Sequence, residues 1–355
     1  MVDVITFDDA IADSTQFAKR HLLLGNGFSI ACRPDIFHYG SLFSKANFSG
    51  NPNLVRVFEV LDTQDFEIAI RNLESGAKLL PIYASSHATA VAQMLADAVA
   101  LKEILLTTIA HNHPDVPGDI PDAKFWACRR FLAHFLGRPN EGQIYTLNYD
   151  LLLYWTLMHE DMPFGDPIEL STSDGFGNDE DDPSADYVVW QGETASHSAK
   201  VHFLHGALHL FDAGNELQKF TWVRTNERLI DQARIAINAN KFPLFVAEGS
   251  SAQKKAKIRH NAYLYQGYKQ LTVNAQQVKH CFFLHGHSLA ENDDHMLRRL
   301  GTGRFKKLYV SLFGPVDSPA NELIIARAYQ LASMRSDRSP MDLSFYDALS
   351  AKIWG

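Results

Sequence analysis

Several short apolar runs in this sequence stop abruptly at glycine or at a small polar residue. Segments with helical spacing separate these runs, and such alternation predicts an α/β fold whose sheet is mostly parallel and covered by helices on both faces. In an open sheet of this Rossmann-like type, ligands bind at the carboxyl ends of the strands. The ends of the apolar runs lie at residues 25–29, 147–150, 205–206, 248–251 and 286–288.

The segment 51–137 has a different texture, because no part of it resembles a strand. Phe66, Ile70 and Leu73 recur on one helical face, and Gly76 is a stop signal for that helix. We therefore predict a helical insert that follows the first strand. Two further helices within it are expected over residues 86–112 and 122–136.

The rest of the chain is expected to form one Rossmann-like domain from residues 1–50 and 138–355. Residues 165–200 are rich in Gly, Asp, Ser and Pro, which predicts a long surface excursion. The aromatic segment 344–354 is expected to dock on the sheet domain, with an oligomer contact as the alternative. Strands after the insert are expected over residues 142–150, 200–206, 242–249, 280–288 and 306–314.

The composition limits the possible classes of function. The chain has 355 residues and a formal net charge of −8, which argues against nucleic acid as its main partner. Its three cysteines are isolated, so neither a zinc ribbon nor a disulfide framework is recognisable. No stretch approaches the roughly 20 apolar residues of a membrane span, and the first residues lack a signal-peptide pattern. We therefore expect a cytoplasmic protein without a membrane partner.

The first apolar run ends at Gly25, Asn26 and Gly27, which Phe28 and Ser29 follow. Glycine lets backbone N–H groups approach a ligand, and a helix starting here would direct its dipole at a phosphate. A tight strand-to-helix turn also uses glycine for its geometry alone, so a purely structural role is the alternative. The third glycine of a dinucleotide fingerprint and the Gly-Lys-Ser/Thr of a P-loop are both missing, which disfavours dehydrogenases and P-loop NTPases.

Clustered histidines raise the question of a metal site. His202, His205 and His209 lie close together in the sequence, as do His285 and His287. If the first of these segments is a strand, His202 and His205 point to opposite faces, which suits a shared zinc ion poorly. We therefore expect no metal.

The ordered set of motifs resembles the SIR2-like superfamily. The motifs are "GNGFSIACRPDIF", "TLNYD", "LHG" and "GHSLAENDDHML", and they follow one another between residues 25 and 297. They are similar to those of SIR2-like NAD hydrolases in bacterial phage-defence systems and of a SIR2-related bacterial family. Position 26 is Asn where sirtuins have Ala, and the four zinc cysteines of deacylating sirtuins are missing.

The resemblance implies that NAD is bound as substrate and that the zinc module is absent. It assigns Asn148 and His205 as the catalytic pair and places the turn Gly25–Ser29 on the diphosphate. It also places Asn148 and Asp150 against NAD. The segment implied to contact the adenosine half consists of Gly286, His287 and Ser288.

The chemistry of these side chains fits cleavage of the nicotinamide–ribose bond. Nicotinamide leaves as a neutral group, so no general acid is required. Asn148 can hold a water or a ribose hydroxyl, Asp150 can lie near the developing positive charge, and His205 can accept a proton. The structural alternatives are that Asn148 and Asp150 cap the helix that begins near Leu151 and that His205 is a core residue.

We therefore expect an NAD glycohydrolase that releases nicotinamide and ADP-ribose, acting as a bacterial anti-phage effector in abortive infection. One alternative is a sensor that binds NAD or ADP-ribose without turnover, and another is a deacylase or ADP-ribosyltransferase. An effector must stay silent until triggered, so we expect a homo-oligomer and a defence partner protein. The helical insert and residues 165–200 are the candidate gates. NADP is an alternative substrate, with Lys254 or Arg259 near its 2′-phosphate.

Overall fold

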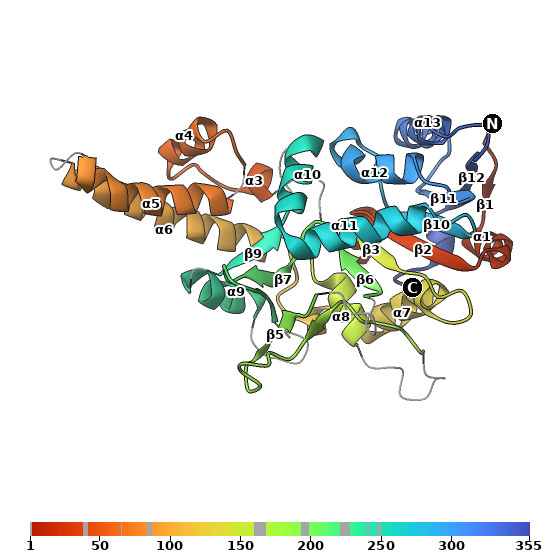
Figure 1. Cartoon of the computed structure of the whole chain (residues 1–355), viewed down its shortest axis with the longest axis horizontal. Helices are drawn as coiled ribbons and strands as arrows, with labels where there is room; N and C mark the ends of the chain where they lie inside the picture. The colour runs from red at the N-terminus through yellow and green to blue at the C-terminus, as the bar shows by residue number, and fades with distance from the viewer. Residues whose placement is uncertain are drawn as a thin grey trace.

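The computed structural model describes residues 2–37, 42–64, 66–83, 87–159, 168–192, 199–220, 228–239, 241–246 and 250–355. Its centre is a seven-stranded parallel sheet. In order across the sheet (Figure 1), the strands are β1 (Val4–Ile5), β12 (Asp342–Asp347), β11 (Lys307–Leu312), β10 (His280–His285), β2 (Lys19–Leu24), β3 (Ile144–Thr146) and β6 (Val201–Phe203).

The order of these strands is that of a Rossmann fold. Starting from β2, the chain adds β3 and β6 on one side and then returns to add β10, β11 and β12 on the other. This corresponds to the order 3-2-1-4-5-6, with the short β1 added at the edge beyond β12. The topological switch point therefore lies between β2 and β10. The predicted α/β, Rossmann-like fold class is confirmed.

Helices cover both faces of the parallel sheet, as the alternation of side chains along its strands requires. In β10, Phe283 packs against Phe135 of α7, whereas Phe282 lies on the other face, near Tyr145. Asn274 of α11 donates a hydrogen bond to the Tyr145 hydroxyl on that second face. The helices of the sheet domain are α1 (Phe7–Asp13), α2 (Gly27–Cys32), α7 (Asp122–Leu136), α8 (Leu152–Met158), α11 (Ala262–Ala275), α12 (Asp294–Gly301) and α13 (Pro319–Ser333).

A second, antiparallel sheet continues from β6, and the sequence patterns did not predict it. Its strands, in order, are β4 (Phe176–Gly177), β5 (Tyr187–Trp190), β8 (Leu217–Phe220), β7 (Gly206–Asp212) and β9 (Phe242–Phe245). Two further helices, α9 (Leu229–Asn238) and α10 (Ser251–His260), precede and follow β9.

Two expectations are corrected by this second sheet. The segment 165–200 is not simply a surface excursion, because β4 and β5 pair within the sheet; residues 165–167 and 193–198 of this segment lie outside the described residues. The apolar run at 242–249 pairs with β7 and not with the parallel sheet. Its predicted end at residues 248–249 lies outside the described residues. The pairings of β5 with β8 and of β7 with β9 join segments that other elements separate in the chain, so local patterns could not reveal them.

Between residues 51 and 137, the described residues form helices and no strand, as predicted. Gly76 does not end α5, because it lies against α6, where an added Cβ would sit 2.4 Å from Met94 Cε. The glycine therefore allows two helices to pack closely and does not act as a stop. Figure 1 shows α5 and α6 side by side, projecting away from the sheets. The helices before α7 are α3 (Leu42–Lys45), α4 (Pro52–Val60), α5 (Phe66–Tyr83) and α6 (Ala88–His111).

The C-terminal segment docks on the sheet domain, as predicted. Strand β12 pairs in parallel with β11, and the chain then passes back to the first glycine turn. The Trp354 Nε1 donates to the carbonyl oxygen of Phe28 at 2.8 Å, and the two rings lie 5.0 Å apart. This segment therefore supports α2 from outside the sheet.

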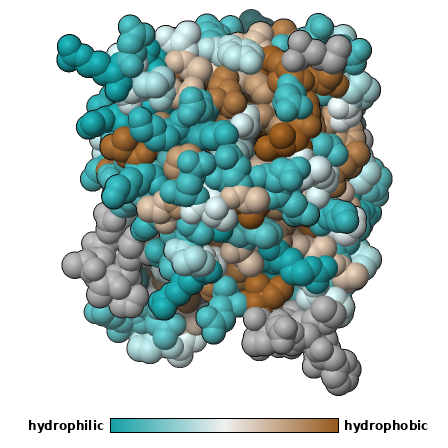
Figure 2. Space-filling model, turned by 90° about the vertical axis from the view of Figure 1, so that its right-hand side faces the viewer, coloured by the Kyte–Doolittle hydropathy of each residue, from teal (hydrophilic) through white to brown (hydrophobic). Residues whose placement is uncertain are grey.

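Within the described ranges, no helix combines the length and the hydropathy needed to cross a lipid bilayer. Figure 2 shows the side of the molecule at the right of Figure 1, which is mostly hydrophilic with apolar residues gathered toward its upper right.

Candidate functional site

Two polar networks lie at the carboxyl edge of the parallel sheet, and both contact Gly25. The first, called here the Asn148 network, consists of Ser29, Asn148 and Asp150. The second, called the histidine–aspartate cluster, consists of His205, Lys254, His287, Asp293 and His295. The sequence motifs that were predicted to form one rim therefore meet near the switch point of the sheet.

The Asn148 network is buried and tightly connected. The Asn148 Nδ2 donates to the carbonyl oxygen of Gly25 at 3.0 Å and to Ser29 Oγ at 3.1 Å, and the Ser29 hydroxyl donates to Asp150. Asn148 is 8% exposed and Asp150 is 5% exposed. These bonds fix the orientation of the amide. In the part of the chain that the structure describes, its Oδ1 accepts no hydrogen bond and is available to a ligand.

Asp150 also holds the start of α8. It accepts a hydrogen bond from the Leu152 N–H at 2.9 Å, while the adjacent Leu151 N–H donates to His113 Nε2 at 2.9 Å. Burial raises the pKa of Asp150 above its ordinary value, and the hydrogen bonds from Ser29 and Leu152 oppose that rise. The helix-start role considered for Asp150 is thus present, whereas the Asn148 side chain binds the glycine turn.

The glycines of the first turn are explained by close contact with the turn after β10. A Cβ on Gly25 would lie 2.6 Å from the Gly286 carbonyl oxygen and 2.9 Å from His287 Cβ. The N–H groups of Gly25 and Gly27 donate to the carbonyl oxygens of His285 and Gly286. Gly286 itself adopts a φ of +65°. These two N–H groups therefore bind protein in this structure and do not face an open phosphate cradle.

The other predicted contact residues have different environments. Phe28 is buried against Trp354, so its ring belongs to the core. Asn26 is half-buried at the start of α2, and Ser288 is exposed beyond the second turn. Of these three, Asn26 and Ser288 are the ones that a ligand could reach without repacking.

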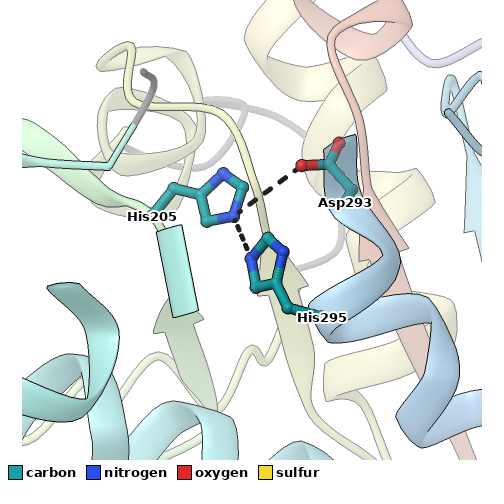
Figure 3. A group of neighbouring side chains, drawn as sticks. All are labelled: His205, Asp293 and His295. Carbon is teal, nitrogen blue, oxygen red and sulfur yellow. Dashed lines mark hydrogen bonds and ion pairs between the residues drawn. The ribbon is translucent and has the colours of Figure 1, made fainter. Parts of the chain in front are cut away.

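The histidine–aspartate cluster centres on the carboxylate of Asp293. Lys254 Nζ lies 3.0 Å from Asp293 Oδ1, and His287 Nε2 lies 3.4 Å from Oδ2. His205 Nε2 lies 4.0 Å from Oδ1 and 3.1 Å from His295 Nε2. Figure 3 shows His205, at the start of β7, pointing toward Asp293 and His295 at the start of α12. Residues from the turn before β7, from α10, from the turn after β10 and from the start of α12 therefore meet at one carboxylate.

Neighbouring elements hold this cluster in place. Arg327 of α13 donates to the Leu289 carbonyl oxygen and pairs with Asp294, which anchors the loop before α12. Ser251 at the start of α10 contacts His295 twice, accepting from its backbone N–H at 2.8 Å and lying 3.2 Å from its Nδ1. The orientation of His295 is thus set by α10 and by the anchored loop together.

Burial dominates the electrostatics of the cluster. It lowers the pKa of His205 to about 3 and that of His295 to about 4, although the nearby Asp293 charge acts in the opposite direction. Both imidazoles are therefore neutral at neutral pH. Burial would raise the pKa of Asp293, but the hydrogen bond from His287 and the charge of Lys254 help to hold it below its ordinary value. The carboxylate is therefore charged.

A cavity of about 1080 Å³ lies next to the cluster. Lys254 is part of its wall, together with residues of α4, α5, β9 and α10. The Val246 N–H at the end of β9 donates to the carbonyl oxygen of His205, so the cavity wall is joined to the cluster by backbone as well. The helical insert thus forms one side of a cavity that meets the histidine–aspartate cluster at Lys254, and no residue of the Asn148 network is among its described lining residues.

Of the histidines that lie close together in the sequence, His205 and His287 reach one centre, the carboxylate of Asp293, and the others have separate environments. His202 stacks on Tyr145, His209 stacks on Tyr154, and His285 binds the hydroxyl of Tyr346. His205 instead meets Asp293 and His295, which the sequence reasoning assigned no role. The sequence signal that could have pointed to Asp293 and His295 is the spacing of acids and histidines in "GHSLAENDDHML". The loop between residues 286 and 293 brings these two residues to His205.

Comparison with known proteins gives the family. A search among curated proteins found no match. The sequence matches a protein family described as "Domain of unknown function (DUF4917)" over residues 22–354. This range includes the antiparallel sheet, the helical insert, every residue of the two polar networks and all strands of the parallel sheet except β1 and the first half of β2. The chain therefore belongs to the DUF4917 family.

Proposed function

We propose that the protein is an NAD glycohydrolase that cleaves NAD to nicotinamide and ADP-ribose. The observation that carries the proposal is that Ser29, Asn148 and the His205 cluster meet around Gly25, beside the switch point between β2 and β10. Nucleotides bind at this position in Rossmann-type sheets. The cavity of about 1080 Å³ that adjoins Lys254 is large enough for a dinucleotide.

Asn148 is the best-supported candidate for contact with the reacting ribose. Its Nδ2 is committed to Gly25 and Ser29, so its Oδ1 is presented in a fixed direction. A fixed acceptor at a ribose hydroxyl or at the attacking water provides orientation without a cost at the moment of reaction. Asp150 supports it through Ser29 and acts as a positioning residue.

His205 contributes as a neutral acceptor in this proposal. A pKa of about 3 makes its imidazole a weak general base at neutral pH. Nicotinamide leaves as a neutral molecule, so the enzyme need not supply a strong acid. The role left for His205 is to accept a hydrogen bond from the attacking water. In the described part of the chain, His205 Nδ1 has no hydrogen-bonding partner and is available for it.

The biological setting is part of the same proposal. The motif resemblance supports a bacterial anti-phage effector, and an enzyme that consumes NAD must be silent until it is triggered. We therefore propose a homo-oligomer with a defence partner protein, gated by the helical insert that forms one wall of the cavity.

The test is release of nicotinamide from NAD by the purified protein. Asn148→Ala and His205→Ala are each expected to lose at least about 100-fold in rate, the low end for a group that assists proton transfer. His202→Gln is the matched control, because His202 stacks on Tyr145 outside both networks, and it is expected to keep its activity.

Two outcomes would contradict the proposal. Unchanged turnover by His205→Ala would remove that residue from the mechanism. Tight NAD binding without turnover by the wild type, both alone and with a lysate of phage-infected cells added to supply the trigger, would identify a sensor and not a hydrolase.

A further inference from the structure

We propose that His205, Asp293 and His295 form a binding site for a divalent transition-metal ion of the zinc type. One ligand atom of each residue lies within 4.8 Å of those of the other two. Two imidazole nitrogens and one carboxylate oxygen are a donor set that suits zinc and its neighbours in the first transition row. The inference does not depend on NAD being the substrate. A metal ion on His205 Nε2 would leave the hydrogen on Nδ1, so metal binding and the acceptor role proposed for Nδ1 exclude each other.

The distance between the two imidazoles carries the proposal. His205 Nε2 and His295 Nε2 face each other at 3.1 Å (Figure 3). Two nitrogen ligands of a tetrahedral zinc ion, each about 2.0–2.1 Å from the metal, lie about 3.3 Å apart. The Asp293 Oδ1 lies 4.0 Å from His205 Nε2. It would need to approach by less than about 1 Å to complete the third ligand position.

The surroundings orient these ligands in the way that metal sites require. Ser251 Oγ lies 3.2 Å from His295 Nδ1 and can accept its hydrogen, which leaves Nε2 as the ligating nitrogen. His287 Nδ1 accepts the Leu289 N–H at 2.8 Å, so its Nε2 carries the hydrogen that faces Asp293 Oδ2. His287 therefore orients the carboxylate and is not itself a ligand.

Lys254 is the competing cation. Its ammonium lies 3.0 Å from Asp293 Oδ1, the same oxygen that faces His205. A dication at the three ligands would be repelled by this charge at short range. The Asp293 carboxylate therefore faces both Lys254 and the proposed metal position. Removal of the lysine charge should strengthen metal binding.

The experiment is calorimetric titration of the full chain with Zn²⁺ after removal of metals by a chelator. Co²⁺ is the second probe, because its visible absorption reports the number and type of ligands. The wild type is expected to bind one Zn²⁺ per chain with high affinity. His295→Gln and Asp293→Asn are each expected to weaken binding by more than about 100-fold, beyond the range typical of residues outside the ligand set.

Two further variants sharpen the result. Lys254→Met is expected to bind Zn²⁺ more tightly than the wild type. His285→Gln is the matched control, since His285 is buried at the end of the same sheet and binds Tyr346, and its affinity should match that of the wild type. Circular dichroism of each variant establishes that it is folded. His295→Gln changes no charge, so it tests the site even if Asp293→Asn unfolds.

The proposal would be overturned by a wild type that binds neither Zn²⁺ nor Co²⁺, or that binds them no more tightly than His295→Gln does. An equal loss of affinity in His285→Gln would also overturn it, because binding would then not be specific to the three residues. None of these readouts involves NAD, so failure of the metal site and failure of the proposed hydrolase are distinguished.

Discussion

Gly286 shows how tightly single residues are constrained where the two turns of the site meet. Its φ of +65° is in the left-handed region, and an added Cβ would lie 2.6 Å from the Phe28 nitrogen. Gly25 is crowded in the same way by His287. The glycines that look like a ligand-binding motif in the sequence are therefore required by the protein's own backbone. A role in ligand binding would come in addition to that requirement.

Gly286→Ala is expected to lower the free energy of unfolding by about 2–4 kcal/mol, because the left-handed backbone and the overlap with Phe28 both oppose a Cβ. Denaturation by urea measures the change. Gly118→Ala is the matched control, since Gly118 is exposed and a Cβ there would meet nothing within 4 Å, and its effect should stay within about 0.5 kcal/mol. A Gly286 variant as stable as this control would contradict the conclusion that the backbone of the turn requires glycine at this position.

At the scale of secondary-structure elements, the C-terminal segment joins the last strand of the sheet to the first glycine turn. Strand β12 lies between β1 and β11, and Trp354 then packs on α2 through Phe28. The first and last elements of the Rossmann domain therefore stabilise each other. The position of α2 beneath the Asn148 network depends on a tryptophan more than 300 residues away in the chain.

Trp354→Ala is expected to destabilise the protein by about 3 kcal/mol, as removal of a large buried side chain does. Trp354→Phe keeps most of the ring contact and loses the hydrogen bond to the Phe28 carbonyl oxygen, so about 1 kcal/mol is expected. Urea denaturation separates the two. Equal losses in both variants would show that the hydrogen bond, and not the packing, holds the segment.

For the whole molecule, buried histidines make stability depend on pH. Burial lowers the pKa of His113 and His202 to about 4 and that of His285 to about 3, against an ordinary value of 6.5. The unfolded chain binds protons on these groups near pH 6.5, whereas the folded chain stays neutral until about pH 4. The buried histidines therefore cost the folded state nothing above about pH 7, and the free energy of unfolding decreases as the pH falls below that value.

Each such histidine is expected to remove about 1.4 kcal/mol of stability per pH unit below about pH 6. The free energy of unfolding, measured by urea denaturation between pH 7.5 and about 5, should fall steeply. His202→Phe keeps an aromatic ring on Tyr145 and removes one titrating group. Its free energy of unfolding should therefore fall by about 1.4 kcal/mol less per pH unit than that of the wild type. A free energy that does not change with pH over this interval would contradict the burial of neutral imidazoles.

The sequence by itself determined the fold class, the helical character of residues 51–137 and the positions of most strands of the parallel sheet. These features are local, because apolar runs, helical spacing and the residues that end a strand are visible within a few positions. It also grouped Gly25, Asn148, His205 and Gly286, since parallel strands bring their carboxyl ends to one edge.

Only the tertiary structure decided which atoms of that edge meet. The pairing of β7 with β9, the packing of Gly76 on α6, the closure of the two glycine turns on each other, and the contact of His205 with Asp293 and His295 all join segments that are separated in the chain. Such pairings depend on side-chain volumes and on the paths of whole elements. They leave no period or spacing in the sequence from which they could be read.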